Sequence, residues 1–367
     1  MATRGSTTFG ETCSSNHLPL CTCRSAYLRD GHIGKPRKRT VMSSLYPFTD
    51  TDLHLAFRKV VDTLFDKKRD YVDGVLKPKM LIIAGAQGSG KTYLLEKTLL
   101  KSGRYDNYVR LYETHFRELH PHYRAMEDKG VLHVYEHTEP FIWRLGAMIC
   151  TYAMENKYNI IMETALDSPH FADFPPDAAL KGYQSEVHLI ACQKEFSHWS
   201  TLDRVVNSVG NHELERVVSL TQIEEAQING RSIIDAFENA CIEVPGSEIV
   251  IYRRGLETDR NSLPVCHSTC PEKGRLVPQQ TYQGREFFRG ADLKIDFKVQ
   301  RSPQADFPCS YIQYAQVVHA GLLGSKHRRT MAELNCKTLG QAQKLMSQLP
   351  VDVYRELCLY VLKYAQP

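Results

Sequence analysis

The sequence predicts an α/β fold, a doubly wound parallel sheet of the P-loop NTPase type with helices on both faces. Three observations support this. Short apolar runs typical of buried strands alternate with longer amphipathic segments. One such run, MLIIAG, leads directly into the complete phosphate-binding motif GAQGSGKT. The last sixty residues repeat apolar side chains at helical spacing, which indicates a mostly helical C-terminal extension.

We expect three parts: a disordered tail over 1–44, an α/β domain over 45–258, and an extension over 259–367 that is loop-rich and then helical. The tail is rich in Ser, Thr, Gly and Cys and has no amphipathic period. Its basic run KPRKR favours a solvated tail over an anionic partner or a targeting signal. Four candidate zinc ligands lie close together, but their spacing matches no familiar zinc finger: Cys13, His17, Cys21 and Cys23.

The α/β domain begins with a helix and continues as alternating strands and helices. Thr49 is the candidate N-cap of the first helix, with two aspartates in the first turn. Another helix is predicted over 139–157, with Thr138 as its cap and Pro140 in its first turn. Apolar composition predicts five buried strands: 80–85, 108–113, 158–164, 185–193 and 246–254.

The composition of the sequence changes after these strands. Residues 261–284 contain many turn-forming residues and are interpreted as a loop. Cys266 and Cys270 in this segment are candidate metal ligands, but two cysteines do not make a metal site. The extension then shows apolar residues on one helical face, most simply for core packing: Val353, Leu357, Val361 and Tyr364.

Composition and charge argue against a membrane-spanning or nucleic-acid-binding protein. The 367 residues carry a formal charge of +4, which is too small to predict a nucleic-acid partner. No apolar run approaches the length of a membrane-spanning helix, and the N-terminus lacks the apolar core of a signal peptide. Eleven cysteines without a framework spacing indicate reduced thiols. We therefore expect a cytoplasmic protein whose partners are neither a membrane nor nucleic acid.

The motif GAQGSGKT predicts a site for ATP and Mg²⁺. Glycines permit turns that direct backbone N–H groups at phosphate oxygens, and the following helix contributes the partial positive charge of its N-terminus. Lys91 can reach the β- and γ-phosphates, and the Thr92 hydroxyl can ligate Mg²⁺. The predicted nucleotide-binding residues are Gly85, Ala86, Gln87, Gly88, Ser89, Gly90, Lys91 and Thr92.

Other residues favour a kinase over a GTPase or a motor ATPase. A GTPase is expected to carry a base-reading NKxD stretch, and the sequence has none. A motor usually has an Asp or an Asp-Glu pair at the end of an apolar strand. Here the strand YNIIMET ends with the single carboxylate of Glu163. One carboxylate beside the P-loop can orient Mg²⁺-bound water or accept a proton from an acceptor hydroxyl.

The order of motifs resembles the zeta toxin family of P-loop kinases over roughly residues 46–252. The resemblance runs through PFTD, GAQGSGKT, HFRELHPHY, YNIIMETALDS, GYQSEVHLIACQKEFSHWSTLDR and ERVVSLTQIEEA. It implies transfer of the ATP γ-phosphoryl group to a sugar hydroxyl of a nucleotide-like acceptor, of the UDP-N-acetylglucosamine or NAD type. It also implies a toxin- or effector-like role and an antitoxin or chaperone protein as a partner.

The resemblance assigns roles to individual residues. Lys91 and Thr92 match the phosphate and magnesium residues, and Glu163 matches an acceptor-binding glutamate. Arg204 and, more loosely, Arg216 match the lid arginines that clamp phosphates. A guanidinium group suits that role because charge spreads over the transferring phosphoryl group.

Two positions depart from the family pattern. The family's base aspartate falls at Thr114, and threonine is not a base near neutral pH, so Glu113 and His115 are the candidate bases. We place the acceptor near Thr114, His120 and Glu163 at the carboxyl ends of the strands. Sugar-nucleotide kinases of the family usually have an arginine four residues after this glutamate. Asp167 stands there instead and would repel an anionic diphosphate.

The missing aspartate leaves a second hypothesis from another class. The chain would then be a nucleotide-binding interaction protein with weak or no catalysis, and its C-terminal helices would bind a partner. A third interpretation is a kinase on the same scaffold that acts on a nucleotide or a simple sugar. The metal-site interpretation of RLYETHFRELHPHY (110–123) is disfavoured because no further ligands converge by motif.

Overall fold

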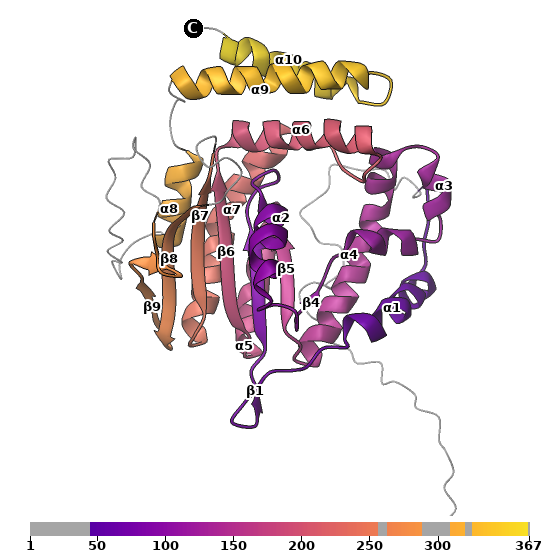
Figure 1. Ribbon diagram of the computed structural model, residues 1–367. Helices are drawn as coiled ribbons and strands as arrows, with labels where there is room; N and C mark the ends of the chain where they lie inside the picture. The colour runs from indigo at the N-terminus through magenta and orange to yellow at the C-terminus, as the bar shows by residue number, and fades with distance from the viewer. Residues whose placement is uncertain (1–44, 256–262, 288–308, 320–324, 366–367) are drawn as a thin grey trace, which may run out of the picture. The chain divides into compact units, whose positions relative to one another are not determined.

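The computed structural model describes residues 45–255, 263–287, 309–319 and 325–365 (Figure 1). The expected tail over 1–44, its basic run and its candidate zinc ligands lie outside these residues. The division at residue 258 into an α/β domain and an extension stays a prediction.

A seven-stranded sheet forms the centre of the fold. Its strand order is β4-β5-β3-β6-β7-β8-β9, in which the first five strands pair in parallel, β8 pairs antiparallel with β7, and β9 pairs antiparallel with β8. This confirms the mostly parallel, doubly wound sheet. The strands are β3 Lys79–Ala84, β4 Val109–Arg110, β5 Ile160–Thr164, β6 Gln184–Cys192, β7 Glu248–Arg254, β8 Leu263–Glu272 and β9 Arg275–Pro278, and two small hairpins are formed by β1 Tyr71–Val72 with β2 Val75–Leu76 and by β10 Thr281–Tyr282 with β11 Arg285–Glu286.

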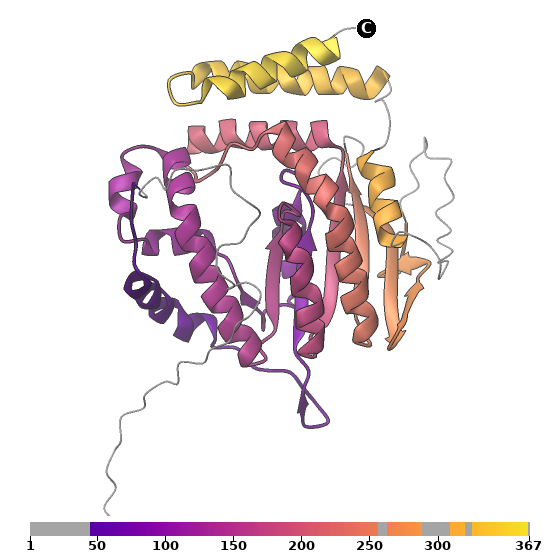
Figure 2. The same cartoon turned by 180° about the vertical axis from the view of Figure 1, so that it is seen from behind.

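Helices cover both faces of the sheet, as expected (Figures 1 and 2). One face packs against α1, α4, α5, α7 and α8 in the largest hydrophobic cluster. The other face packs against α2 and the helical turns that continue it. The α-helices are α1 Asp50–Leu64, α2 Lys91–Leu94, α3 Tyr123–Glu127, α4 Val131–Glu155, α5 Phe174–Leu180, α6 Lys194–Asn211, α7 Leu220–Glu243, α8 Cys309–Val318, α9 Ser325–Lys344 and α10 Val351–Ala365.

The register of the central strands fixes where functional groups meet. Strand β3 lies between β5 and β6, and every residue from Met80 to Ala84 is buried. Ile83 on β3 stands beside Glu163 on β5. The chain leaves β3 for one side of the sheet and later returns to the other side. The P-loop therefore lies at the topological switch point, where open α/β sheets bind ligands.

Of the two predicted N-caps, one is confirmed and one is wrong. Thr49 is the N-cap of α1, and its hydroxyl and the Asp52 carboxylate form a capping box. The predicted cap at Thr138 is wrong, since α4 already begins at Val131 and Pro140 lies inside it. The Thr138 hydroxyl donates to the carbonyl oxygen of Val134 at 2.7 Å, one turn earlier. Gly130 precedes the helix, and it carries no side chain that could have signalled a cap.

The interpretation of residues 261–284 as a loop is also wrong. Strand β8 pairs antiparallel with β7 and extends the central sheet, and β9 pairs with β8. Cys266 and Cys270 are buried residues of β8 that pack in the main core. Within the described residues, no group of three or more His, Cys, Asp or Glu side chains could hold a metal ion.

The C-terminal segment is helical, as predicted. Helices α9 and α10 contact each other and pack on α6 through a separate hydrophobic cluster. Three polar contacts join the same elements: His198 Nδ1 with the Tyr360 hydroxyl at 2.8 Å, Thr338 with Asp203 at 2.8 Å, and Lys363 with Glu195 at 3.2 Å. The C-terminal pair therefore covers the side of α6 that carries these residues.

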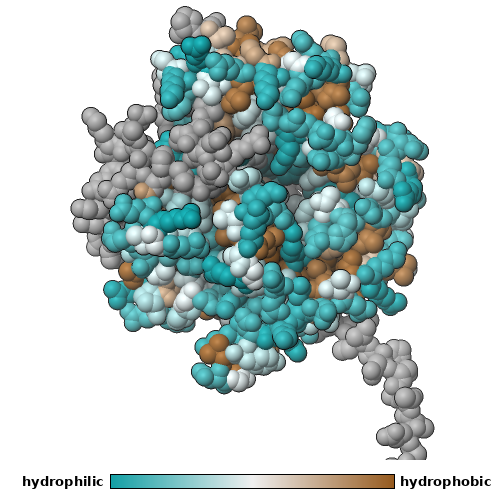
Figure 3. All heavy atoms as spheres, in the orientation of Figure 1, coloured by the Kyte–Doolittle hydropathy of each residue, from teal (hydrophilic) through white to brown (hydrophobic). Residues whose placement is uncertain are grey.

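The β1–β2 hairpin is an apolar element of the described surface. Figure 3 shows hydrophobic surface on the β1–β2 hairpin at the lower edge of the molecule, where Tyr71, Val72 and Val75 are exposed. Across the described residues, no helix has both the length and the apolar character needed to cross a membrane.

Candidate nucleotide and acceptor site

The P-loop joins β3 to α2 and is held by neighbouring elements. Gly88 has a φ of +76°, in the left-handed region that favours glycine. A Cβ atom there would lie 2.1 Å from the carbonyl oxygen of Ser197 on α6. The Ser197 hydroxyl donates to the Gln87 carbonyl oxygen at 2.5 Å, and Arg254 Nη1 donates to the Gly88 carbonyl oxygen at 2.5 Å. Helix α6 and the end of β7 thus fix the conformation of the loop.

Lys91 is the first residue of α2, and its side chain reaches back over the loop. Its Nζ donates to the carbonyl oxygens of Gly85 at 2.6 Å and Ala86 at 3.0 Å. Burial lowers the pKa of Lys91 to about 8. The ammonium group therefore lies in a partly desolvated site, where an arriving phosphate would interact with it more strongly than in water.

Four charged side chains act on Lys91. The carboxylates of Glu163 and Asp167 raise its pKa, whereas the guanidinium groups of Arg204 and Arg216 lower it. Two of these groups contact the P-loop segment directly, since Glu163 Oε2 lies 3.5 Å from Thr92 Oγ1 and Asp167 accepts a hydrogen bond from Gln87. The roles of Glu163, Arg204 and Arg216 stay predictions.

Glu163 at the end of β5 and Thr92 in the first turn of α2 place two side-chain oxygen atoms close together. Thr92 Oγ1 lies 3.5 Å from Glu163 Oε2. Burial raises the pKa of Glu163, while the charges of Lys91 and Arg110 lower it. A hydroxyl and a carboxylate beside a phosphate-binding loop are the donor types that Mg²⁺ prefers.

Each predicted lid arginine is held by a glutamate. Arg204 on α6 forms an ion pair with Glu215. Arg216 precedes α7, and its Nη1 lies 3.9 Å from Glu139 Oε1 on α4. Both arginine side chains keep more than a third of their surface exposed. They therefore remain accessible to a ligand, and their phosphate-clamping role stays a prediction.

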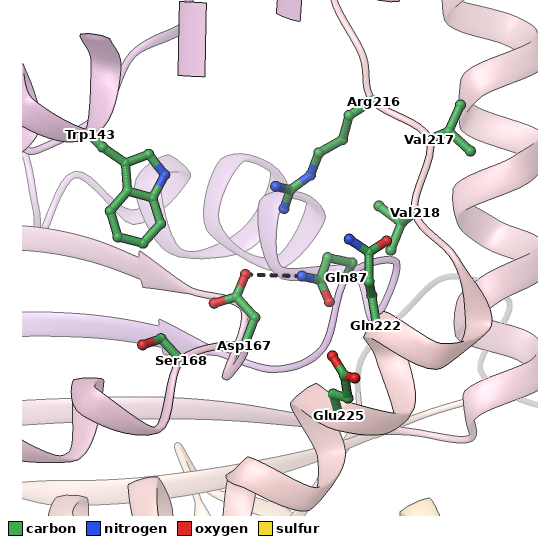
Figure 4. A pocket seen from close by; sticks show the side chains of 9 residues that line it. All are labelled: Gln87, Trp143, Asp167, Ser168, Arg216, Val217, Val218, Gln222 and Glu225. Atoms are coloured by element: carbon green, nitrogen blue, oxygen red, sulfur yellow. Dashed lines mark hydrogen bonds between the residues drawn. The ribbon is translucent and has the colours of Figure 1, made fainter. Parts of the chain in front are cut away.

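A cavity of about 300 Å³ opens beside the P-loop (Figure 4). Asp167 accepts a hydrogen bond from Gln87 Nε2 at 3.1 Å across its floor. The guanidinium group of Arg216 points into the same space. The lining residues are Gln87, Trp143, Asp167, Ser168, Arg216, Val217, Val218, Gln222 and Glu225.

Comparison with known proteins identifies the family. The profile described as Zeta toxin matches residues 61–258, which is more than half of the chain. The chain belongs to the zeta toxin family.

Individual relatives of the family are distant. Toxin PezT of Streptococcus pneumoniae serotype 4 is 26% identical over 162 residues, which cover 43% of this chain and 60% of PezT. A solved chain of the PezAT toxin–antitoxin system of the same species aligns with a TM-score of 0.51 at 18% identity, covering 82% of this chain and 98% of that one. A chain of AvrRxo1-ORF1:-ORF2 with ATP aligns with a TM-score of 0.43 at 10% identity, covering 86% of each. The likeness to PezAT supports the fold.

The remaining residues of the zeta toxin motif lie on the segment after β4. Glu113 has an extended backbone, and its carboxylate lies 3.2 Å from His115 Nδ1. Thr114 begins the following 3₁₀ turn and is exposed. Glu113 and His115 therefore both stay candidates for the general base, and the role of each residue stays a prediction.

His120 occupies a different environment from the one expected for a substrate-binding residue. Its ring is 3% exposed and packs edge-on against Phe48 and Phe141. Burial lowers the pKa of His120 to about 4, so the ring is neutral at pH 7. This packing supports a structural role for the HP pair of the zeta toxin motif, in which His120 anchors the loop to α4. Its substrate-binding role stays a prediction.

Three residues around the site were not anticipated from the sequence: Arg254, Ser197 and Arg117. Arg254 ends β7, so the shared edge of parallel strands could have indicated it. Ser197 bonds to the P-loop because α6 packs beside the loop. No local sequence pattern predicts this contact. Arg117 lies inside HFRELHP and is completely buried, an environment that sequence position alone did not suggest.

Proposed function

We propose that the protein is an ATP- and Mg²⁺-dependent kinase that phosphorylates a sugar hydroxyl of a nucleotide-like acceptor. The observation that carries this proposal is a complete P-loop whose Lys91 lies over the loop, with Glu163 beside Thr92 and Arg216 in the cavity next to Gln87. A carboxylate and two guanidinium groups around a phosphate-binding lysine are suited to hold a transferring phosphoryl group. Membership of the zeta toxin family supports this assignment.

The P-loop would hold the ATP phosphates. Its backbone N–H groups and the N-terminus of α2 attract phosphate oxygens, and Lys91 would exchange its two carbonyl contacts for the β- and γ-phosphates. The Ser89 hydroxyl is fully buried and has no hydrogen-bond partner among the described residues, so the loop contains a donor that a phosphate could satisfy. Arg204 and Arg216 would neutralise charge on the transferring group.

Mg²⁺ fits the oxygen atoms present at this site. The Thr92 hydroxyl and the Glu163 carboxylate would hold the ion together with phosphate oxygens, since they lie 3.5 Å apart at the start of α2. Bound there, Mg²⁺ would supply positive charge against the phosphates.

Glu113 is the proposed general base. Its carboxylate lies 3.2 Å from His115 Nδ1, a contact that can orient the carboxylate. In the transfer step, the acceptor hydroxyl would lose its proton to Glu113, its oxygen would bond to the γ-phosphorus, and the bond to the β-phosphate oxygen would break. The products would be a phosphomonoester and ADP.

Phosphorus NMR tests this proposal directly. The purified chain is incubated with ATP, Mg²⁺ and a panel of nucleotide sugars and dinucleotides. A new phosphomonoester signal is expected with wild-type protein and with Lys97→Ala, which alters an exposed lysine on the same helical segment. The signal should disappear with Lys91→Ala. An equal signal from Lys91→Ala would contradict the proposal.

One observation favours the alternative function, a nucleotide-binding protein with weak or no catalysis: Thr114 stands where the family has an aspartate. The variants Glu113→Gln and Thr114→Asp separate the two functions. If Glu113 is the base, Glu113→Gln abolishes turnover and the double variant regains part of it. If only Thr114→Asp creates product, whereas the wild type binds ATP without turnover, the binding protein is the correct function.

The toxin relationship also suggests a partner and a location. PezT is named a toxin, and the PezAT structure describes a toxin–antitoxin system. We propose by analogy that an antitoxin or chaperone protein binds this chain. We also propose that the chain acts in the cytoplasm. Co-purification from cells that express the chain together with its neighbouring genes tests for such a partner.

A further inference from the structure

Trp143 is an unusual feature of the cavity. The chain contains two tryptophans, and Trp199 is packed against α9 and α10 with 7% of its surface exposed. Trp143 on α4 is 60% exposed and lines the cavity beside the P-loop (Figure 4). A large aromatic ring that faces solvent inside a cavity is a surface that a flat ligand can cover.

The indole of Trp143 is held in place by a hydrogen bond to Glu139, which in turn pairs with a buried arginine. Trp143 Nε1 donates to Glu139 Oε1 at 3.2 Å, one helical turn earlier. Arg117 Nη2 donates to Glu139 Oε2 at 2.5 Å. Arg117 is fully buried, and its guanidinium group lies 3.8 Å from the centre of the Tyr135 ring. The side chain of Glu139 is thus fixed from the core, and it fixes the indole in turn.

The same glutamate links the indole to the phosphate site. Arg216 Nη1 lies 3.9 Å from Glu139 Oε1, the oxygen that accepts from Trp143. Arg216 also lines the cavity together with Gln87 of the P-loop. Trp143 and the lid arginine therefore share one anchor, so a ligand that covers the indole would be placed beside the site of phosphoryl transfer.

The charges of the lining constrain which ring would bind. The cavity presents the carboxylates of Asp167 and Glu225 and the single guanidinium group of Arg216. A ring with a negative charge would be repelled by the two carboxylates. A neutral or cationic ring suits the electron-rich face of the indole, and ring N–H groups can donate to the carboxylates.

We propose that Trp143 is a specificity-determining residue, whose indole stacks on the neutral or cationic heteroaromatic ring of the acceptor, while Glu139 and Arg117 position it. This inference rests on the proposed function, since it names the part of the acceptor that the cavity recognises. Loss of one stacked ring is expected to weaken acceptor binding by roughly ten- to a hundred-fold.

Fluorine NMR of the full chain labelled with 5-fluorotryptophan tests the stacking. The protein gives one signal for each tryptophan, and Trp199 serves as an internal control. The probes are uridine, 1-methylnicotinamide and ribose 5-phosphate, each added after saturation with a non-hydrolysable ATP analogue and Mg²⁺. We expect uridine or 1-methylnicotinamide to shift the Trp143 signal and to leave the Trp199 signal unchanged. Ribose 5-phosphate, which has no ring, should shift neither.

Two results would overturn the inference. One is a Trp143 signal that no ring probe moves. The other is a Trp143 signal that moves on addition of the ATP analogue alone and then responds to no ring probe, since the indole would then stack on the donor's base. Because this readout needs no turnover, shifts by the ring probes that persist in a protein without kinase activity would support the stacking and refute the proposed function.

A kinetic comparison separates recognition from folding. Once an acceptor is known, Trp143→Ala should raise its KM by about ten-fold or more with kcat little changed, whereas Trp143→Tyr should keep most of the affinity. Trp143 is exposed, so neither variant removes core packing. Equal KM values for the alanine variant and the wild type would contradict the inference even if the chain is an active kinase.

Discussion

Replacing Lys91 with methionine is expected to stabilise the nucleotide-free protein while removing phosphoryl transfer. Burial lowers the pKa of Lys91 from 10.5 to about 8 in the folded protein. The folded state therefore penalises the charged form relative to the unfolded chain, in which lysine keeps its ordinary pKa. Methionine has a similar length and no charge, so the substitution removes this penalty.

The size of the effect follows from two opposing contributions. Lowering the pKa from 10.5 to about 8 corresponds to roughly 3 kcal/mol at pH 7. The substitution also removes the hydrogen bonds from Lys91 to the carbonyl oxygens of Gly85 and Ala86, each of which contributes about 1 kcal/mol. We therefore expect a net increase of about 1 kcal/mol in the free energy of unfolding.

This gain has a defined pH dependence. Below about pH 8, Lys91 is charged in both states, so the penalty is fully present in the wild type. Between about pH 8 and pH 10.5, the unfolded chain keeps a proton that the folded protein has lost. Raising the pH through this range therefore increases the stability of the wild type. The stability difference between the variant and the wild type becomes smaller.

Urea unfolding of the wild type, Lys91→Met and Lys97→Met at pH 7 and at a pH near 9.5 measures both effects. Lys97 lies on the same helical segment and is exposed, so Lys97→Met controls for loss of a surface charge. A Lys91→Met variant that is less stable than the wild type at pH 7 would refute the reasoning. So would a difference between the two proteins that is the same at both pH values.

Three further predictions concern packing and protonation. Gly88→Ala should destabilise the protein by several kcal/mol more than Gly103→Ala, because both glycines have similar positive φ but a Cβ at Gly88 would meet the α6 backbone; similar unfolding midpoints would contradict this. Burial lowers the pKa values of His120 and His198 to about 4, so unfolding free energy should fall by about 2 kcal/mol per histidine between pH 7 and pH 5 as the unfolded chain gains protons. A pH dependence that is unchanged in His198→Gln would argue against it. Tyr360→Phe should cost about 1–3 kcal/mol in chemical denaturation, since it leaves the buried His198 nitrogen without its hydroxyl partner; a neutral substitution would show that this contact contributes nothing.

The parts of the fold that were predictable depend on local patterns. The P-loop is contiguous in sequence, and the buried strand before it and the helix after it are both recognisable. Glu163 could be placed because parallel strands end at one edge of the sheet, which the register of β3 and β5 confirms. Thr49 was recognisable because a capping side chain and its partner lie three residues apart.

The errors arose where tertiary structure decides the outcome. Strand β8 contains Cys, His, Ser and Thr among its apolar residues, and it becomes a strand because β7 offers a free edge. Pro140 is tolerated inside α4, although a proline usually marks the first turn of a helix. The start of α4 at Val131 could not be recognised because Gly130 provides no capping side chain.

The candidate site shows the same distinction. Motif order pointed to Lys91, Glu163 and the two arginines, and the structure has Glu163 beside Thr92 and Arg216 in the cavity next to Gln87. Trp143 appeared in the sequence only as one apolar residue of a helix. Its importance depends on Arg117, which reaches Glu139 over a separation of 22 residues, and such a contact leaves no periodic pattern. The physical reason is that an ion pair between distant segments is specified by packing rather than by spacing.

The packing of α9 and α10 on α6 has a consequence for the order of synthesis. A ribosome makes Lys91, Glu163 and both arginines well before residues 325–365 emerge. Until those residues arrive, Phe196, Trp199 and Leu202 of α6 have no cover from the C-terminal helices. A nascent or prematurely terminated chain would expose this apolar face to chaperones and proteases. Once α9 and α10 have formed, they cover the helix that carries Arg204 and holds the P-loop through Ser197.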